Sequence, residues 1–132
     1  MRADKKYTLL FLLLLIPVGL LTKVYTGPLG VWVNHSLGGI IYVIFWSLFL
    51  YLLYPQGHPL TIAGIILLIT CILEYAQLWH PAWLEQLRQS FLGRAMLGTS
   101  FSWLDYIHYI IGFIFSVSLI IFFKKVRQKH SE

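Results

Sequence analysis

Four long apolar segments, nearly free of charged residues, constrain this chain more than any other feature of its sequence. A helix needs about 20 mostly apolar residues to cross the hydrocarbon core of a membrane, where no water can satisfy backbone polar groups. The segments lie at about residues 7–22, 36–54, 60–79 and 102–123. They predict an all-α integral membrane protein, a bundle of four transmembrane helices that forms a single membrane domain over residues 1–132.

Prolines mark the ends of the two middle segments. Pro55 ends the second segment, and the third begins after Pro59 and stops before Pro81. Proline is tolerated at the start of a helix but cannot continue one, so these positions suit helix boundaries. The first segment contains Pro17 and reaches full length only by continuing toward Tyr25. It follows a basic leader, but no small-x-small cleavage site follows it, so we predict an uncleaved span.

Composition excludes the other protein classes. Of the 132 residues, 58% are hydrophobic and 11% are charged, against about a quarter charged in a soluble domain. The 17% aromatic content and the long apolar runs exclude a disordered chain. A single cysteine, Cys71, excludes an intrachain disulfide and a cysteine-based metal cage. The cations are terminal flanks rather than a basic face, so we expect no nucleic-acid partner.

The distribution of positive charge predicts the orientation in the membrane. Seven of the ten Lys and Arg residues lie in the first six and last nine positions, and the other three are Lys23, Arg88 and Arg94. Positive charge marks the cytoplasmic side of a membrane protein, and four spans return both ends of the chain to one side. We therefore predict a multi-pass protein with both termini in the cytoplasm.

The segment between the third and fourth spans, residues 80–100, is too polar to span and too apolar for a loose loop. Its apolar residues recur at helical spacing, namely Trp83, Leu84, Leu87, Phe91 and Leu92. This pattern is typical of an amphipathic helix in the plane of the membrane interface. We predict one short interfacial helix on the outer side.

Ionisable and polar residues gather near this outer end of the predicted bundle. Glu74 lies about five residues inside the third span, and an ionised group inside a span costs a few kcal/mol, so it normally faces the bundle and finds a partner. We expect that partner to be Arg88 or Arg94. Residues three or four positions apart share a helical face, as Glu74 and Gln77 do on the third span and Asp105 and His108 do on the fourth. The predicted ligand-binding residues are Glu74, Arg94 and Asp105 as one coupled group, with Gln77, Arg88 and His108 as a second tier.

Structural roles explain several of these positions equally well. Ser102-x-x-Asp105 matches a capping box at a helix start, and Glu74 suits a purely structural ion pair. Asn34 is read as an N-cap. Gly112-x-x-x-Ser116 and Gly38-Gly39 are typical of close helix contacts, because small residues let backbones approach.

Metal and cofactor chemistry has little support in the sequence. His35, His80 and His108 offer ligand atoms together with the two carboxylates, but no pair has a diagnostic metal-binding spacing. We expect neither a metal nor another cofactor.

Three blocks of the sequence resemble the successive motifs of a known family. WVNHSLGGIIYVIFW, LEYAQLWHP and FLGRAMLGTSFSWLDYIHYIIG are similar to those of a family of small four-span bacterial membrane proteins, domain of unknown function 2809. The likeness covers about Thr22 to Gly112. More distantly, Glu74-x-x-Gln77, a following arginine, and Asp105 with Gly112 resemble the pattern of the VanZ-like family, which has Asn where this chain has Tyr109. That family is associated with the bacterial cell envelope and glycopeptide resistance.

Both resemblances imply a protein of the bacterial cytoplasmic membrane and leave its function open. The leading hypothesis is an envelope protein that binds a phosphate- or amine-bearing lipid headgroup, or a cell-wall intermediate, in an outer-leaflet pocket. The second is an enzyme on a lipid-linked substrate, with Glu74 or the Asp105 and His108 pair as general base. The third is a small structural or accessory subunit. The expected partners are membrane lipid and a lipid-linked or cell-wall molecule, with a homo-oligomer or a larger membrane complex left open.

Overall fold

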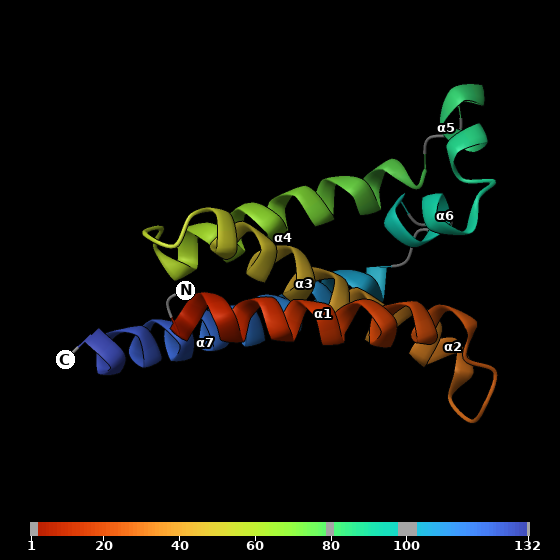
Figure 1. Ribbon diagram of the computed structural model, residues 1–132. Coiled ribbons are helices and arrows are strands. Elements are labelled where there is room, and N and C mark those ends of the chain that lie inside the picture. The colour runs from red at the N-terminus through yellow and green to blue at the C-terminus, as the bar shows by residue number, and fades with distance from the viewer. Residues whose placement is uncertain (1–2, 79–80, 98–102, 132) are drawn as a thin grey trace.

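The computed structural model describes residues 3–78, 81–97 and 103–131, apart from the side chains of residues 3, 4, 31, 34, 35, 95–97, 130 and 131. Every regular element in these ranges is a helix, which confirms the all-α fold class (Figure 1). The elements are α1 (Ala3–Val24), α2 (Gly30–Trp32), the π-helix η1 (Val33–Leu37), α3 (Gly38–Leu53), α4 (Pro59–Ala76), α5 (Ala82–Leu87), α6 (Phe91–Leu97) and α7 (Trp103–Ser131).

Helices α1, α4 and α7 are long and apolar enough to cross a membrane. Helix α3 is also apolar, but its 16 residues fall short of the roughly 20 that a span requires. Helices α2 and η1 precede α3 without a break, so the chain stays helical from Gly30 to Leu53. The structure thus contains three candidate spans and one shorter apolar helix where the sequence predicted four spans.

Helix α7 organises the bundle. It packs against α1, α3 and α4, and α3 packs against both α1 and α4. Successive long helices run in opposite directions, so the described chain begins and ends at one end of the bundle, here called the terminal end (Figure 1). Helices α2, α5 and α6 lie at the opposite end, here called the loop end. The apolar core lies toward the terminal end and contains Leu12, Leu48, Tyr51, Ile62, Ile120 and Phe123.

Gly112 is a point of close approach between α7 and α3. A Cβ atom at Gly112 would lie 3.0 Å from the carbonyl oxygen of Ile40 and 3.0 Å from Cβ of Val43. Such distances are too short for a methyl group against backbone, so only glycine fits without a shift. One turn later, the Ser116 hydroxyl donates to the Gly112 carbonyl at 2.7 Å. The prediction that Gly112 is a helix contact is confirmed.

Two helix ends differ from those expected. Helix α7 continues to Ser131 instead of ending near Phe123, because Lys, Arg and Gln are good helix formers and cations are favoured near a helix C-terminus. Lys124 also places its ammonium 5.9 Å from the centre of the Tyr51 ring. Helix α4 ends at Ala76, since the Gln77 amide donates to the Glu74 carbonyl at 3.1 Å, three residues back.

The predicted interfacial helix over residues 80–100 is instead two short helices, α5 and α6. Ser90 separates them, because its hydroxyl accepts a hydrogen bond from the Gly93 amide at 2.9 Å and so caps the start of α6. A side chain at Gly93 would collide with the Leu87 carbonyl group. Of the five apolar residues that define the predicted helix face, Leu84 is buried and Trp83, Leu87, Phe91 and Leu92 are exposed, so the interfacial location stays a prediction.

Candidate functional site

A hydrogen bond between Glu74 and Tyr109 joins α4 to α7 near the loop end. The Glu74 side chain is only 3% exposed, and the Tyr109 hydroxyl donates to its Oε2 atom at 2.6 Å. That length lies within the range for O–H donors on an ionised carboxylate, which form stronger bonds than neutral pairs do. A buried acid inside the bundle is therefore stabilised by a neutral donor from a different helix.

The glycine pair Gly38 and Gly39 makes room for polar side chains from two other helices. A Cβ atom at Gly39 would lie 2.8 Å from Cε1 of Tyr109, so the tyrosine ring rests directly on the backbone of α3. A Cβ atom at Gly38 would lie 3.4 Å from Nζ of Lys23. The prediction that these glycines are helix contacts is confirmed. The structure adds that they hold Tyr109 and Lys23 in place.

Lys23 and Asp105 complete a group of charges at this position. The Lys23 ammonium, near the end of α1, interacts electrostatically with the carboxylates of Asp105 and Glu74. Asp105 is buried, and it lies one turn before Tyr109 on α7. We call Lys23, Glu74, Asp105 and Tyr109 the polar cluster. Its members come from α1, α4 and α7, which meet only in the folded bundle.

Two further predicted residues, Gln77 and Arg88, lie at the end of α4. The side chain of Gln77 is buried, and its amide donates to the Leu73 carbonyl at 3.2 Å. Arg88 forms an ion pair with Glu85 at 2.7 Å and donates to the Ala76 carbonyl at 3.2 Å. A cation bonded to the last carbonyls of a helix complements the negative end of its dipole. Arg88 therefore fixes α5 against the end of α4.

Arg94 does not make the expected contact with Glu74 among the interactions of the described residues. Its side chain is exposed, and its guanidinium donates to the carbonyl of Gln89 at 2.8 Å and to that of Arg88 at 3.5 Å. These bonds hold α6 against the end of α5. Glu74 is instead bonded by Tyr109 and lies within electrostatic reach of Lys23.

His108 bridges α7 to α2 rather than facing the polar cluster. The Trp32 indole N–H donates to Nε2 of His108 at 3.2 Å, and Nδ1 lies 2.8 Å from the Leu104 carbonyl oxygen. An indole can only donate, so Nε2 is the acceptor and the ring proton is assigned to Nδ1. These two contacts engage both ring nitrogens of His108.

Some predicted features fall outside the described residues or side chains. They are His80, Ser102 of the predicted capping box, and the side chains of Asn34 and His35. Within the described ranges, no three His, Cys, Asp or Glu residues gather closely enough to hold a metal ion.

Sequence reasoning missed Lys23 and Tyr109 as members of the site. The sequence analysis used Lys23 only as one of the cations that predict the membrane orientation. Lys23 is nevertheless the one cation at the outer end of the first predicted span. Tyr109 lies four residues after Asp105, and this spacing places it on one helical stripe with Asp105, His108 and Gly112. It also departs from the VanZ-like pattern, a resemblance that stays a prediction, but it was not named as a site residue.

Comparison with known proteins gives the family and no structural relative. No solved structure matches the chain. A family model described as "Protein of unknown function (DUF2809)" matches residues 29–113. The matched segment includes Gly39, Glu74, Asp105 and Tyr109, whereas Lys23 precedes it. Because the match covers more than half of the 132 residues, the chain belongs to the DUF2809 family.

Proposed function

We propose that this protein is a four-span protein of the bacterial cytoplasmic membrane, whose polar cluster binds a lipid headgroup that carries an ammonium group. The observation that carries the proposal is the composition of the polar cluster, in which two buried acidic residues interact electrostatically with one lysine. Of the two kinds of headgroup in the leading hypothesis, phosphate-bearing and amine-bearing, we therefore favour one that bears an amine.

The membrane topology is the first part of this proposal. Helices α2, η1 and α3 contain 3, 5 and 16 residues in an unbroken run, which at roughly 1.5 Å per residue reaches about 35 Å and exceeds the roughly 30 Å hydrocarbon core. This run would be the fourth span. The cations of α1 and α7 at the terminal end, including Lys5 and Lys125, favour a cytoplasmic location for that end. The loop end would then face the outer leaflet.

The charge balance of the polar cluster favours a cationic group. Among the described residues, the polar cluster contains two carboxyl groups, one amine and one phenol, so its acidic groups outnumber its basic one. The neighbouring Arg88 is matched by Glu85 in an ion pair. An excess negative charge inside a membrane bundle costs a few kcal/mol. An ammonium group from a ligand would offset that cost.

A phosphate next to the ammonium would also find complementary charge at the loop end. Arg94 is exposed and lies on α6, and its guanidinium carries five N–H donors. Lys23 lies at the edge of the polar cluster. A phosphoethanolamine headgroup therefore suits the charges better than a purely anionic one such as phosphoglycerol.

The proposal is tested by lipid retention in native mass spectrometry. The protein would be exchanged into detergent with equal amounts of phosphatidylethanolamine and phosphatidylglycerol, and the lipid that stays bound would be identified. We expect the wild type to retain phosphatidylethanolamine preferentially. Asp105→Asn should lose this preference, because it removes the excess negative charge.

Asp4→Asn is the matched control, since it also removes a carboxylate but lies in the first turn of α1, at the terminal end and far from the polar cluster. It should leave the preference unchanged. Equal retention of the two lipids by the wild type, or a preference for phosphatidylglycerol, would contradict the proposal.

A further inference from the structure

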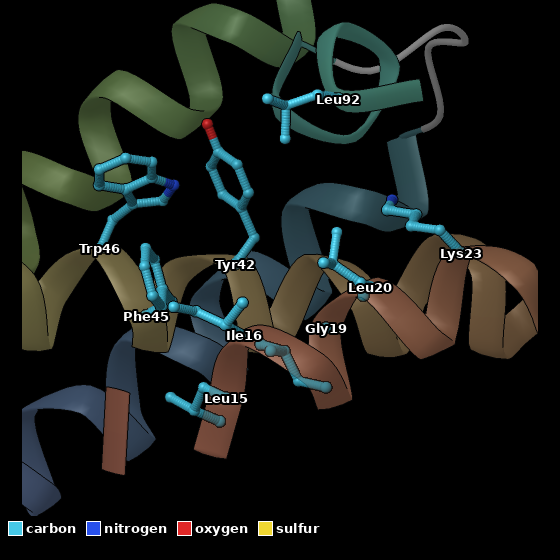
Figure 2. Close-up of a pocket in the computed structure, with 11 residues that line it drawn as sticks. Leu15, Ile16, Gly19, Leu20, Lys23, Tyr42, Phe45, Trp46 and Leu92 are labelled. Carbon is cyan, nitrogen blue, oxygen red and sulfur yellow. The ribbon is translucent and has the colours of Figure 1, made fainter. Parts of the chain in front are cut away.

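An apolar groove of about 290 Å³ lies between α1 and α3 and ends at Lys23 (Figure 2). On the α1 side it is lined by Leu15, Ile16 and Gly19, and on the α3 side by Ile41, Phe45 and Trp46. Figure 2 shows Trp46 at one end of the groove and Lys23 at the other, with Leu92 of α6 on the loop-end side. The groove and the polar cluster therefore share one residue, Lys23.

The walls of the groove are mainly apolar, and two of their polar side chains bond to each other. Tyr42 and Trp46, one turn apart on α3, form a side-chain hydrogen bond, in which the indole N–H can only donate. Their rings also meet edge to face, with centroids 6.1 Å apart. The groove thus offers mainly apolar surface to an occupant.

The dimensions of the groove match one acyl chain in one leaflet. Leu15 and Lys23 lie eight residues apart on α1, which corresponds to about 12 Å along the helix. One leaflet of the hydrocarbon core is about 15 Å deep, half of the roughly 30 Å total. A chain seated from Lys23 to Trp46 would begin at the headgroup level and end near the middle of the bilayer. An additional helix is about 10–12 Å wide with its side chains and would find only two turns of contact.

We propose that the α1–α3 groove holds one acyl chain of the lipid whose ammonium group is bound at the polar cluster. This inference rests on the proposed function, because the headgroup identifies the lipid. The geometry supports it through Lys23, which lines the groove and interacts with both carboxylates. A lipid whose phosphate lies near Lys23 would have its ammonium beside Asp105 and its chain between α1 and α3.

Gly19 provides the means to test the groove separately from the headgroup site. A Cβ atom at Gly19 would lie 3.4 Å from Cγ2 of Ile41, an ordinary contact distance, so a larger side chain there would fill the groove. Gly64 on α4 has nothing within 4 Å of its Cβ position, so Gly64→Leu is the matched control. Ile16→Trp fills the same groove from a half-exposed position and serves if Gly19→Leu fails to fold.

The experiment uses the full chain in nanodiscs that contain phosphatidylethanolamine with a diazirine in one acyl chain. After illumination, the labelled residues are mapped by peptide mass spectrometry, and the same protein is assayed for retention of phosphatidylethanolamine over phosphatidylglycerol. We expect label on the groove residues of α1 and α3 in the wild type and in Gly64→Leu. Gly19→Leu and Ile16→Trp should lose that label.

The other outcomes separate this inference from the proposed function. Label spread over all lipid-facing helix surfaces and unchanged in Gly19→Leu, with the headgroup preference intact, would overturn the groove and leave the headgroup site standing. Label that depends on Gly19 but is equal for diazirine-labelled phosphatidylglycerol would overturn the headgroup preference. It would also overturn the identification of the groove's occupant as the lipid bound at the polar cluster.

Discussion

Replacing Tyr109 by phenylalanine removes only the hydroxyl group that donates to Glu74, and therefore tests this one hydrogen bond of the polar cluster. Hydrogen bonds between membrane helices contribute about 0.6 kcal/mol on average and up to about 1.7 kcal/mol. Bonds to charged groups in soluble proteins contribute about 1.5–3 kcal/mol. The Tyr109 bond is short, at 2.6 Å, and its acceptor is buried, so we place it at the upper end of the membrane range. We expect Tyr109→Phe to lower the free energy of unfolding by about 1.5 kcal/mol.

The measurement is a titration with sodium dodecyl sulfate in mixed micelles, followed by circular dichroism. Tyr75→Phe is the matched control, because Tyr75 lies next to Glu74 in the sequence but its side chain is 67% exposed. In a Glu74→Gln background the cost of Tyr109→Phe should fall to about 0.5 kcal/mol, since the acceptor is then neutral. A cost equal to that of Tyr75→Phe, or one that is the same in both backgrounds, would refute the role of this hydrogen bond.

Three further predictions use the same unfolding assay. Gly112→Leu should lower the free energy of unfolding by about 1–3 kcal/mol, because α7 contacts the α3 backbone there; an effect no larger than that of Gly64→Leu would argue against this contact. Lys23→Gln and Asp105→Asn should together cost less than the sum of their separate effects, because Lys23 interacts with two carboxylates in the wild type but only with Glu74 once residue 105 is neutral; simple addition would mean that the two side chains act independently. Leu29→Gly should raise stability by up to about 1 kcal/mol, because Leu29 has a φ of 59°, which glycine adopts without strain; an unchanged or lower stability would contradict this.

The sequence predicted the helices more reliably than their ends. A helix that crosses the hydrocarbon core needs an apolar run of about 20 residues. The long apolar runs therefore predicted the positions of α1, α4 and α7. They do not report where a helix stops. Helix α7 leaves the apolar run near Phe123 and continues through the basic residues, since these are good helix formers.

The sequence also located the acids of the candidate site but not their partners. Glu74 and Asp105 stood out because an acid inside a span is costly wherever it lies, and this cost can be judged from one helix alone. Their partners depend on how helices pack against each other. The arginines of α5 and α6 bond to main-chain carbonyls or to Glu85, whereas Tyr109 and Lys23 contact α3 at two adjacent glycines.

The glycines of α3 and α7 explain why the polar cluster forms at the loop end and not elsewhere in the bundle. At Gly39 and Gly112 the two helices approach closely, and at Gly39 the space is filled by the Tyr109 ring instead of an apolar side chain. The apolar core, by contrast, is filled at the terminal end by large side chains such as Leu48 and Ile120. Packing and polar chemistry are therefore divided between the two ends. A ligand can interact with the carboxylates at the loop end while the contacts that hold the bundle together at the terminal end remain unchanged.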